Sequence, residues 1–394
     1  MPEPTSRDPV RRGARPRPRV AGRVRGAAVR LRGAGGRARR AWRSARARRA
    51  AWRADPHVVA LDLVRQVERV APALPRRNLS RTFVADGRAL LPAPAPELVS
   101  SLLPAAPAPA TGAERLAAPV AADAVVLAKF ALLGGVKLRA AYASGRLTLA
   151  VDGSGDLARQ GRIRASHQVV GACDPALIPP LVAHGVLPGG ACWLVEGWVD
   201  GAPLATGVSL AAAAAELLER LRGVHVGHGV EQLRLVDWWD APRQEQWQET
   251  VETGIVPPLV ADVVEGLLAA GGTVATSWCH GDLVASTVLR TPAGLVLVDW
   301  ERAGVAPVML DAARLHLFSG DPGRTLGEIH AGWAWPLAPG ELGHAQQLAL
   351  AHAFQLSAYA LRRAGLEGHP RSAVYQRQAG RSVQRLAQVL DLPV

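Results

Sequence analysis

The chain has 394 residues, with 46 Lys and Arg against 33 Asp and Glu, which gives a formal net charge of +13. The charge is uneven, because residues 1–53 hold 18 arginines against Glu3 and Asp8, a net charge of +16, which leaves −3 for the other 341 residues. A mildly acidic body argues against a nucleic-acid-binding protein as a whole. Hydrophobic residues at 49% and charged residues at 20% are typical of globular proteins and exclude a wholly disordered chain.

The first 53 residues consist mainly of Arg, Gly, Ala and Pro and predict a disordered tail. Within it, Arg39–Arg53 places Trp42 and Trp52 among arginines, a composition that suits the surface of a membrane. Contact with nucleic acid and a tail that is merely solvated are the alternatives. The tail lacks the apolar core of a secretory signal, so we expect a cytoplasmic protein, with membrane-surface association through residues 1–53 as a further option.

No segment of the chain predicts a transmembrane helix. The longest uncharged run, Pro175–Val195, contains four prolines, which a membrane-spanning helix does not tolerate at this density. The three cysteines are widely spaced and form no CxxC pair, so neither a zinc site nor a disulfide framework is expected.

Residues 54–123 predict a helix followed by a linker. Apolar residues recur at helical spacing over His57–Ala71, and Pro72 ends that pattern. Leu90–Val120 is dominated by Pro and Ala, which is typical of a linker or an irregular wrapping segment.

Residues 124–200 predict a small α+β lobe. Alternating or apolar runs indicate five strands with one helix, at about Leu157–Gly171, between the third and the fourth. The predicted strands are Val125–Phe130, Val136–Ala143, Arg146–Val151, Leu181–Val186 and Cys192–Trp198.

Residues 201–394 predict a second, mostly helical lobe. Its clearest helical patterns are Leu210–Leu221, Leu259–Ala270, Glu341–Leu361 and Ser372–Leu390. The expected fold class is therefore α+β, with a five-stranded N-terminal lobe that carries one helix and a mostly helical C-terminal lobe.

The segment with the clearest chemistry lies among these helices. His280-Gly281-Asp282 is followed by two apolar runs that a Pro/Gly turn separates, and the second run ends at Asp299. If Arg290 faces Leu295 in the hairpin, Thr287 faces Val298, and Asp299 returns to the end that holds Asp282.

Two carboxylates placed in this way suit phosphoryl transfer. One can accept the proton of the attacking hydroxyl, and the other can hold the Mg²⁺ that bridges the phosphates of ATP. The structural alternative is that Asp282 caps backbone N–H groups in a turn and that Asp299 begins a helix.

The pattern of His280-Gly281-Asp282, four residues, Thr287, and then Val298-Asp299-Trp300-Glu301 with a later Asp311 resembles the aminoglycoside phosphotransferase and choline kinase family. The resemblance covers about Ala124–Val394 and implies a bilobal protein-kinase-like fold, ATP, Mg²⁺ and a small-molecule acceptor with a hydroxyl group. It implies Asp282 as the catalytic base, His280 as the residue that orients its loop, Asp299 as the main metal ligand and Asp311 as an anchor for a helix.

The same resemblance assigns the nucleotide-binding residues. Glu196-Gly197-Trp198 would form the hinge whose backbone faces adenine, and Gly134-Gly135 would lie at the phosphate loop. The sequence departs from the family in three places. Thr287 stands where the family has a metal-binding Asn, and we expect its hydroxyl to serve as a second Mg²⁺ ligand beside Asp299. Ala150 stands where the family has a basic residue, and the helix has no Glu.

Lys137 is the residue we expect to compensate. The chain has only two lysines among its 46 basic residues, and Lys137 lies two residues after Gly135 on the second strand. A solvent-facing role is the alternative, and Arg139 on the same face of the strand is a second candidate for phosphate contact.

Two further clusters have a structural and a functional interpretation. His225 and His228 are a candidate metal pair or part of a helix end that is only structural. Trp238-Trp239, between Asp237 and Asp240, either line an acceptor site or pack in a helical insertion. There is no GxxxxGK[ST] motif, which excludes a P-loop NTPase by pattern.

The sequence therefore predicts an ATP- and Mg²⁺-dependent phosphotransferase acting on a hydroxyl of a sugar, an aminoglycoside or an amino alcohol. The alternative, motivated by Ala150 and Thr287, is a pseudokinase with weak or no activity that binds a nucleotide or a partner.

Overall fold

The computed structural model describes eight ranges of the chain, namely 56–75, 81–86, 89–92, 115–131, 135–204, 206–333, 336–367 and 372–393. The chain divides into two compact units, Met1–Asp55 and Pro56–Val394, and all of the helices and strands below belong to the second. The predicted disordered tail of residues 1–53 lies outside the described residues.

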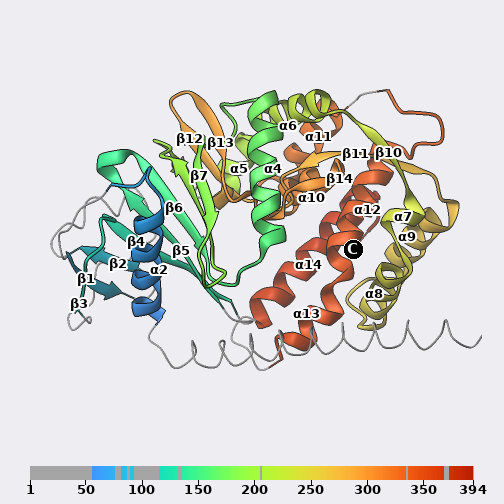
Figure 1. The fold of residues 1–394 in the computed structure, drawn as a ribbon. Coiled ribbons are helices and arrows are strands. Elements are labelled where there is room, and N and C mark those ends of the chain that lie inside the picture. Colours follow the sequence, from blue (N-terminus) through green and yellow to red (C-terminus); the bar gives the residue numbers. More distant parts are fainter. Residues whose placement is uncertain are drawn as a thin grey trace, which may run out of the picture. The chain divides into compact units, whose positions relative to one another are not determined.

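The N-terminal lobe contains the five predicted strands in one antiparallel sheet. They pair in the order β4-β5-β6-β8-β7, and Figure 1 shows them as one twisted layer. Their bounds are within two residues of the prediction: Ala124–Ala131 (β4), Gly135–Tyr142 (β5), Leu147–Asp152 (β6), Leu181–Val186 (β7) and Cys192–Gly197 (β8). The expected α+β lobe is confirmed.

Three further strands extend this sheet to eight, which the sequence did not predict. β1 (Arg81–Asp86), β2 (Ala89–Pro92) and β3 (Arg115–Ala118) continue it beyond β4 in the order β3-β1-β2-β4. They fall in the segment expected to be a linker after its helix. Short strands at a sheet edge tolerate Pro at their ends, as at Pro92, and so give a weak alternating signal. Most of the Pro/Ala-rich run, residues 93–114, lies outside the described residues.

The predicted first helix, α2 (Pro56–Val70), covers one face of the sheet. Its apolar side, which includes Val64 and Val67, joins a core cluster with Leu138 and Leu149 from the strands. The carboxylate of Glu68 accepts hydrogen bonds from the N–H groups of Ala121 and Ala122 and from the hydroxyl of Tyr142. Burial, with the Glu68 charge, raises the pKa of the Tyr142 hydroxyl, which therefore stays a donor. These bonds to Glu68 anchor α2 and do not involve the other face of the sheet.

The helix α4 (Leu157–Cys173) lies between the sheet and the C-terminal lobe, as Figure 1 shows. Asp156 caps its first turn by accepting the N–H of Arg159 at 3.0 Å. Because neighbours in a strand point to opposite faces, Lys137 and Arg139 of β5 lie on the face away from Leu138 and α2. That second face carries Lys137 and Arg139 toward the candidate site.

The C-terminal lobe is mostly helical, as predicted, and two three-stranded sheets are embedded in it. The predicted helix at Leu210–Leu221 is two helices that meet at Ala213, and the one at Glu341–Leu361 begins at His344 and is interrupted at Ala358. The helices are Gly207–Ala212 (α5), Ala214–His228 (α6), Leu235–Trp238 (α7), Ala241–Glu252 (α8), Pro258–Ala270 (α9), Met309–Phe318 (α10), Pro322–Gly332 (α11), His344–Ser357 (α12), Tyr359–Gly365 (α13) and Ser372–Val389 (α14).

The two small sheets carry the segment with the predicted chemistry. β11 (Thr273–Cys279) pairs with β10 (Glu231–Arg234) on one side and with β14 (Gly304–Pro307) on the other. β12 (Val288–Thr291) pairs with β13 (Gly294–Leu297) and with β9 (Ala202–Pro203). None of the helices in the described ranges is long and apolar enough to cross a membrane.

Candidate active site

The loop after β11 has a backbone that only glycine fits. Gly281 has a φ of +78°, and a Cβ atom there would lie 2.5 Å from the carbonyl oxygen of Arg302. The buried carboxylate of Asp311, in the first turn of α10, accepts the N–H groups of His280 at 2.7 Å and of Gly281 at 2.8 Å. Asp311 therefore anchors the loop that precedes Asp282 to the start of a helix.

His280 connects this loop to the end of the hairpin. Its ring is fully buried, with Nε2 3.0 Å from the carbonyl oxygen of Val298 and Nδ1 3.3 Å from the backbone nitrogen of Asp282. A carbonyl only accepts and an amide only donates, so Nε2 carries the proton and Nδ1 accepts. Burial lowers the pKa of His280, which agrees with a neutral ring. Because both nitrogens are occupied, His280 positions the loop.

The hairpin has the register on which the sequence argument depended. Arg290 is paired with Leu295, and the N–H of Val298 donates to the carbonyl oxygen of Thr287 at 2.9 Å. The returning chain therefore delivers Asp299 to the end of the hairpin next to the loop. Asp299 has a φ of +71°, uncommon for a residue other than glycine, and its side chain is 45% exposed. Such a strained acid at the mouth of a hairpin is typical of functional sites.

Two arginines that the sequence analysis did not single out contact the carboxylate of Asp282. Nη2 of Arg314, from α10, bonds to one of its oxygens, and Nε of Arg302 lies 3.6 Å from the other. The Arg314 side chain is 16% exposed and lies over the ring of Phe318. Burial lowers the pKa of Arg314 to about 10. In a chain with 44 arginines, no sequence signal separates these two from the rest.

Thr287 uses its hydroxyl inside the loop. The oxygen accepts the N–H of Val284 at 3.1 Å and lies 2.9 Å from the carbonyl oxygen of Val284 and 3.2 Å from that of Asp282. The side chain is buried. A hydroxyl with these partners fits poorly as a ligand for Mg²⁺, whereas the exposed carboxylate of Asp299 fits well.

On the sheet side, Arg139 is the basic residue paired with Asp299. Its guanidinium lies 3.6 Å from a carboxylate oxygen of Asp299 and 3.6 Å from one of Glu196. Arg139 is directly opposite Ala150 in the register of β5 and β6. Lys137 is instead held by acids, 3.8 Å from Asp152 and 3.9 Å from Glu301. The basic residue paired with Asp299, the predicted metal ligand, is therefore Arg139, the second candidate for phosphate contact. Lys137, the first candidate, pairs with other acids.

The helix α4 presents a positive charge to these acids. Arg159 forms ion pairs with Asp152 and Glu301, and Nε of Arg162 donates to the carbonyl oxygen of Glu301 at 3.1 Å. Burial by itself would raise the pKa of Asp152, but hydrogen bonds from Ser154 and the charges of Arg159 and Lys137 lower it overall. The sequence analysis noted the missing Glu on this helix but did not predict that an arginine would pair with the acids.

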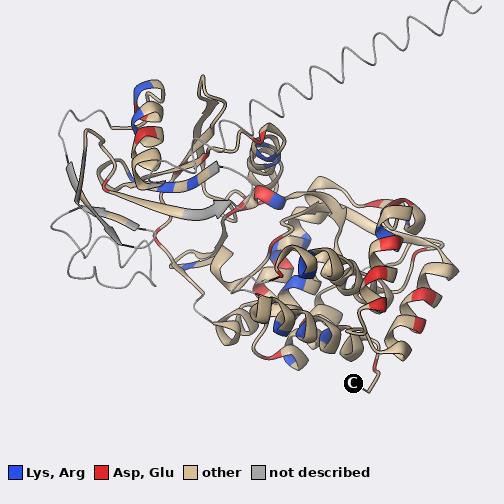
Figure 2. Cartoon of the chain, turned by 90° about the horizontal axis from the view of Figure 1, so that it is seen from below, with Lys and Arg blue, Asp and Glu red and all other residues tan. Residues whose placement is uncertain are grey.

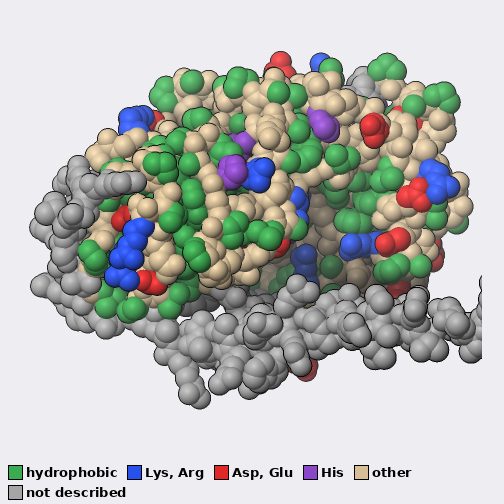
Figure 3. Space-filling view, viewed as in Figure 1, with side chains coloured by type: hydrophobic (Ala, Val, Ile, Leu, Met, Phe, Trp, Pro, Cys, Tyr) green, Lys and Arg blue, Asp and Glu red, His purple; other side chains and the backbone are tan. Residues whose placement is uncertain are grey.

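A cavity of about 150 Å³ lies between the sheet, α4 and the short helix Trp300–Arg302. Figure 3 shows basic side chains at the border of the hollow between the two lobes. The lining of the cavity brings together Lys137, Arg139, Glu196 and Asp299 with the apolar side chains of Ala150 and Leu194. Charges of both signs therefore meet beside an apolar wall.

A family model described as the phosphotransferase enzyme family matches residues 156–345. Residues 156–345, called the phosphotransferase segment below, are thus similar to this family. The match contains Asp282 and Asp299 and thus confirms the resemblance read from that segment. It begins after Lys137, Arg139 and Ala150, so the basic residues of β5 lie outside the phosphotransferase segment.

Solved structures of several kinases are similar to the chain at low identity. A choline/ethanolamine kinase family protein from Mesorhizobium loti is 17% identical, with a TM-score of 0.42, over 66% of this chain and 86% of its own. The choline kinase LicA from Streptococcus pneumoniae is 18% identical, with a TM-score of 0.42, over 64% and 89%. A spectinomycin phosphotransferase in complex with ADP and spectinomycin is 11% identical, with a TM-score of 0.45, over 69% and 94%. No curated protein matched the chain.

Within the phosphotransferase segment, the predicted hinge has a different arrangement from the one expected. The side chain of Glu196 is buried, 3.1 Å from Nε2 of His167. The N–H groups of Gly197 and Trp198 donate to the carbonyl oxygens of Pro180 and Arg146. Neither N–H is available to adenine in this arrangement. Gly135 begins β5, and Gly134 lies outside the described residues.

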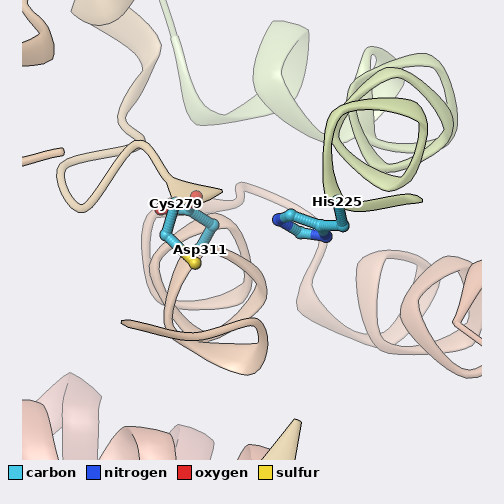
Figure 4. Close-up of side chains that lie close together, drawn as sticks. All are labelled: His225, Cys279 and Asp311. Atoms are coloured by element: carbon cyan, nitrogen blue, oxygen red, sulfur yellow. The ribbon is translucent and has the colours of Figure 1, made fainter. Parts of the chain in front are cut away.

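A second cluster of metal-ligating types lies behind the loop. His225 of α6 points toward Cys279 and Asp311, and their ligand atoms lie within 4.8 Å of one another (Figure 4). Both oxygens of Asp311 already accept loop N–H groups, and burial raises the pKa of the Cys279 thiol. The cluster belongs to the core of the phosphotransferase segment, and His228 does not join it because its ring packs on Trp278.

The two neighbouring tryptophans, Trp238 and Trp239, pack in the core. Trp239 is fully buried against Trp247 and Phe354, and Trp238 stacks on Phe354 with ring centroids 5.1 Å apart. Packing, the structural interpretation of this pair, is therefore confirmed.

Proposed function

We propose that this protein is an ATP- and Mg²⁺-dependent phosphotransferase that moves a phosphoryl group to a hydroxyl of a small molecule. One observation carries the proposal: His280 joins the loop of Asp282 to the hairpin that ends in Asp299. Two carboxylates on one rigid support, next to a cavity with basic residues, suit the positioning and charge stabilisation on which phosphoryl transfer depends.

Each acid has a separate proposed role. Asp282 takes the proton of the acceptor hydroxyl as the acceptor oxygen bonds to the γ-phosphorus and ADP leaves. For this, its carboxylate has to exchange its contact with Arg314 for one with the acceptor. Asp299, with its exposed carboxylate, would hold Mg²⁺. Held there, Mg²⁺ would offset the negative charge of the phosphates.

The remaining predicted residues have supporting roles in this proposal. Arg139 contacts the phosphates, because it is already paired with Asp299 and lies opposite Ala150. Lys137 helps to hold Asp152 and Glu301 in place on the border of the same cavity. His280 and Thr287 hold the loop in shape.

The test is a thermal-shift measurement with ATP, in the presence and absence of Mg²⁺. We expect ATP to raise the melting temperature of the parent more strongly when Mg²⁺ is present, and Asp299→Asn to remove the Mg²⁺-dependent part. Asp321→Asn, a change of equal charge at the cap of α11, is the control and keeps the full shift. A parent that does not respond to ATP contradicts the proposal.

A pseudokinase is the second candidate, and the ion pair between Arg314 and Asp282 favours it, because it occupies the proposed base. ADP release separates the two. Mg²⁺-dependent ATP binding without ADP release over a broad acceptor panel supports the pseudokinase, whereas release that Asp282→Asn abolishes supports the enzyme.

The arginine-rich residues 1–53 are a separate proposal, for contact with a membrane surface or nucleic acid, supported by their net charge of +16. Vesicles with anionic lipid and a DNA duplex should bind the full chain better than a chain that begins at Ala54, and salt should weaken the difference. Equal binding of the two chains argues against it.

A further inference from the structure

The guanidinium of Arg314 retains hydrogen-bonding capacity beside the proposed base. It has five N–H donors, and Nη2 donates to the carboxylate of Asp282. Its Nε is buried without a hydrogen-bond partner among the described residues. The ring of Phe318, 4.8 Å away, supports one face of the guanidinium. A buried donor of this kind fits an anion that comes from outside.

A second arginine is close to the first. Arg302 approaches Asp282 from the other side. Two positive charges, those of Arg314 and Arg302, therefore flank one carboxylate, and the excess repels cations.

The helices around this point share the same imbalance. α10, α13 and α14 together carry six arginines and one acid, Asp311, whose oxygens are bound to the loop. Five acids lie instead on α8 and α9, namely Glu245, Glu249, Glu252, Asp262 and Glu265. Figure 2 shows Lys and Arg gathered on one part of the helical lobe and Asp and Glu on another.

We propose that the acceptor carries an anionic group, such as a phosphate or a carboxylate, that binds Arg314 and Arg302 next to Asp282. This inference rests on the proposed function and narrows its acceptor. The anion takes over Nη2 of Arg314, and the carboxylate of Asp282 becomes available to the acceptor hydroxyl. Amino alcohols and aminoglycosides, which bring positive charge, are disfavoured by the same arginines.

The first test measures binding with the nucleotide site already filled. The protein is saturated with ADP and Mg²⁺, and the melting temperature is followed as glycerol 3-phosphate, glycerate, glycerol or choline is added. We expect stabilisation by the two anions and none by glycerol or choline. Arg314→Gln and Arg302→Gln should each weaken the apparent affinity for the anions about tenfold, the value of one charged hydrogen bond.

The control is Arg363→Gln, which removes the same charge from an exposed residue of α13. It should bind the anions like the parent. If the parent does not respond to the anions, or if the three substitutions weaken binding equally, the inference is wrong. Arg302→Gln keeps the contact between Arg314 and Asp282, so it remains informative if Arg314→Gln fails to fold.

The second test measures ADP release with the same four compounds as acceptors. We expect the two anionic acceptors to be used and glycerol and choline not to be. Release with choline or glycerol that exceeds release with the anions contradicts the inference but leaves the phosphotransferase proposal intact. Failure of ADP and ATP to bind contradicts the proposed function itself, so the two failures are distinguishable.

Discussion

The candidate site has a loop side, which holds Asp282, and a sheet side, which holds Arg139. The two sides differ in how their charged residues are arranged. On the loop side, Asp282, Asp299 and Asp311 stand in the order that the resemblance implied, and each has an identifiable contact. On the sheet side, Ala150 stands where a basic residue was expected, and Arg139 on the neighbouring strand lies opposite it. A backbone-held loop depends on particular residues, whereas an ion network can be rebuilt from another strand.

The polarity of the helix α4 makes the same difference clearer. Its Arg159 pairs with Asp152 of β6 and with Glu301, which follows Asp299 by two residues. The acids are thus on the strand and on the short helix after the hairpin, and the positive charge is on α4. An ion pair still joins the sheet to α4. Its positive charge is on the helix and its negative charge on the strand, the reverse of the pattern that the resemblance implied.

The largest expected effect concerns the loop side. Asp282→Asn should reduce ADP release with the best acceptor by about 10²–10⁴-fold, because the acceptor hydroxyl loses its proton acceptor. ATP should still stabilise the protein, since the carboxamide replaces the carboxylate without loss of volume. Asp321→Asn serves again as the control. Undiminished release in Asp282→Asn means that Asp282 is not the base.

The second prediction concerns stability at acidic pH, which we expect to depend on the helical lobe rather than on the sheet. Burial lowers the pKa values of His225 and His316 to about 4. The unfolded chain therefore binds more protons between pH 6.5 and 4, so stability should fall as the pH is lowered through that window. Each residue contributes about 3 kcal/mol to the loss. Chemical denaturation at several pH values measures it.

The matched variants for this pH effect are His316→Asn and His184→Asn. His184 is an exposed residue of β7 whose pKa is also lowered by burial but which is mostly accessible to solvent. His316→Asn should flatten the pH dependence, and His184→Asn should leave it nearly unchanged. The same flattening in both variants contradicts the assignment to the helical lobe.

The third prediction tests the backbone of the loop. Gly281→Ala should destabilise the protein by about 1–3 kcal/mol, because alanine is strained at a φ of +78° and its Cβ meets the carbonyl of Arg302. Gly304→Ala, where the space around the added Cβ is open, is the control in β14. Urea denaturation measures both. Equal stability of the two variants argues against a strained loop.

The smallest effect separates the two basic candidates on β5. Arg139→Ala should raise the KM for ATP about tenfold, because it removes one charged contact next to Asp299. Lys137→Ala should raise it less, since Lys137 lies between Asp152 and Glu301. Arg146→Ala, on an exposed ion pair with Asp200, is the control. A larger effect for Lys137 restores it as the main phosphate contact.

The five strands of the N-terminal lobe and the hairpin register were predictable because their signal is local. Alternation fixes which side of β5 carries Lys137 and Arg139, and a Pro/Gly turn fixes that Arg290 faces Leu295. The strands β1 to β3 were missed because edge strands are short and their pattern is obscured by Pro and Ala. The tryptophan pair, Trp238 and Trp239, could be read as a site or as packing until its burial was known.

The sequence by itself determined the loop, the two acids and the exclusion of a P-loop, because each follows from residues close together in the chain. Only the tertiary structure decided which arginines meet Asp282, which basic residue pairs with Asp299, and that α4 brings a positive charge to Glu301. The physical reason is that an ion pair is set by distance in space. Arginine is so abundant in this chain that its position along the sequence carries almost no information about its partner.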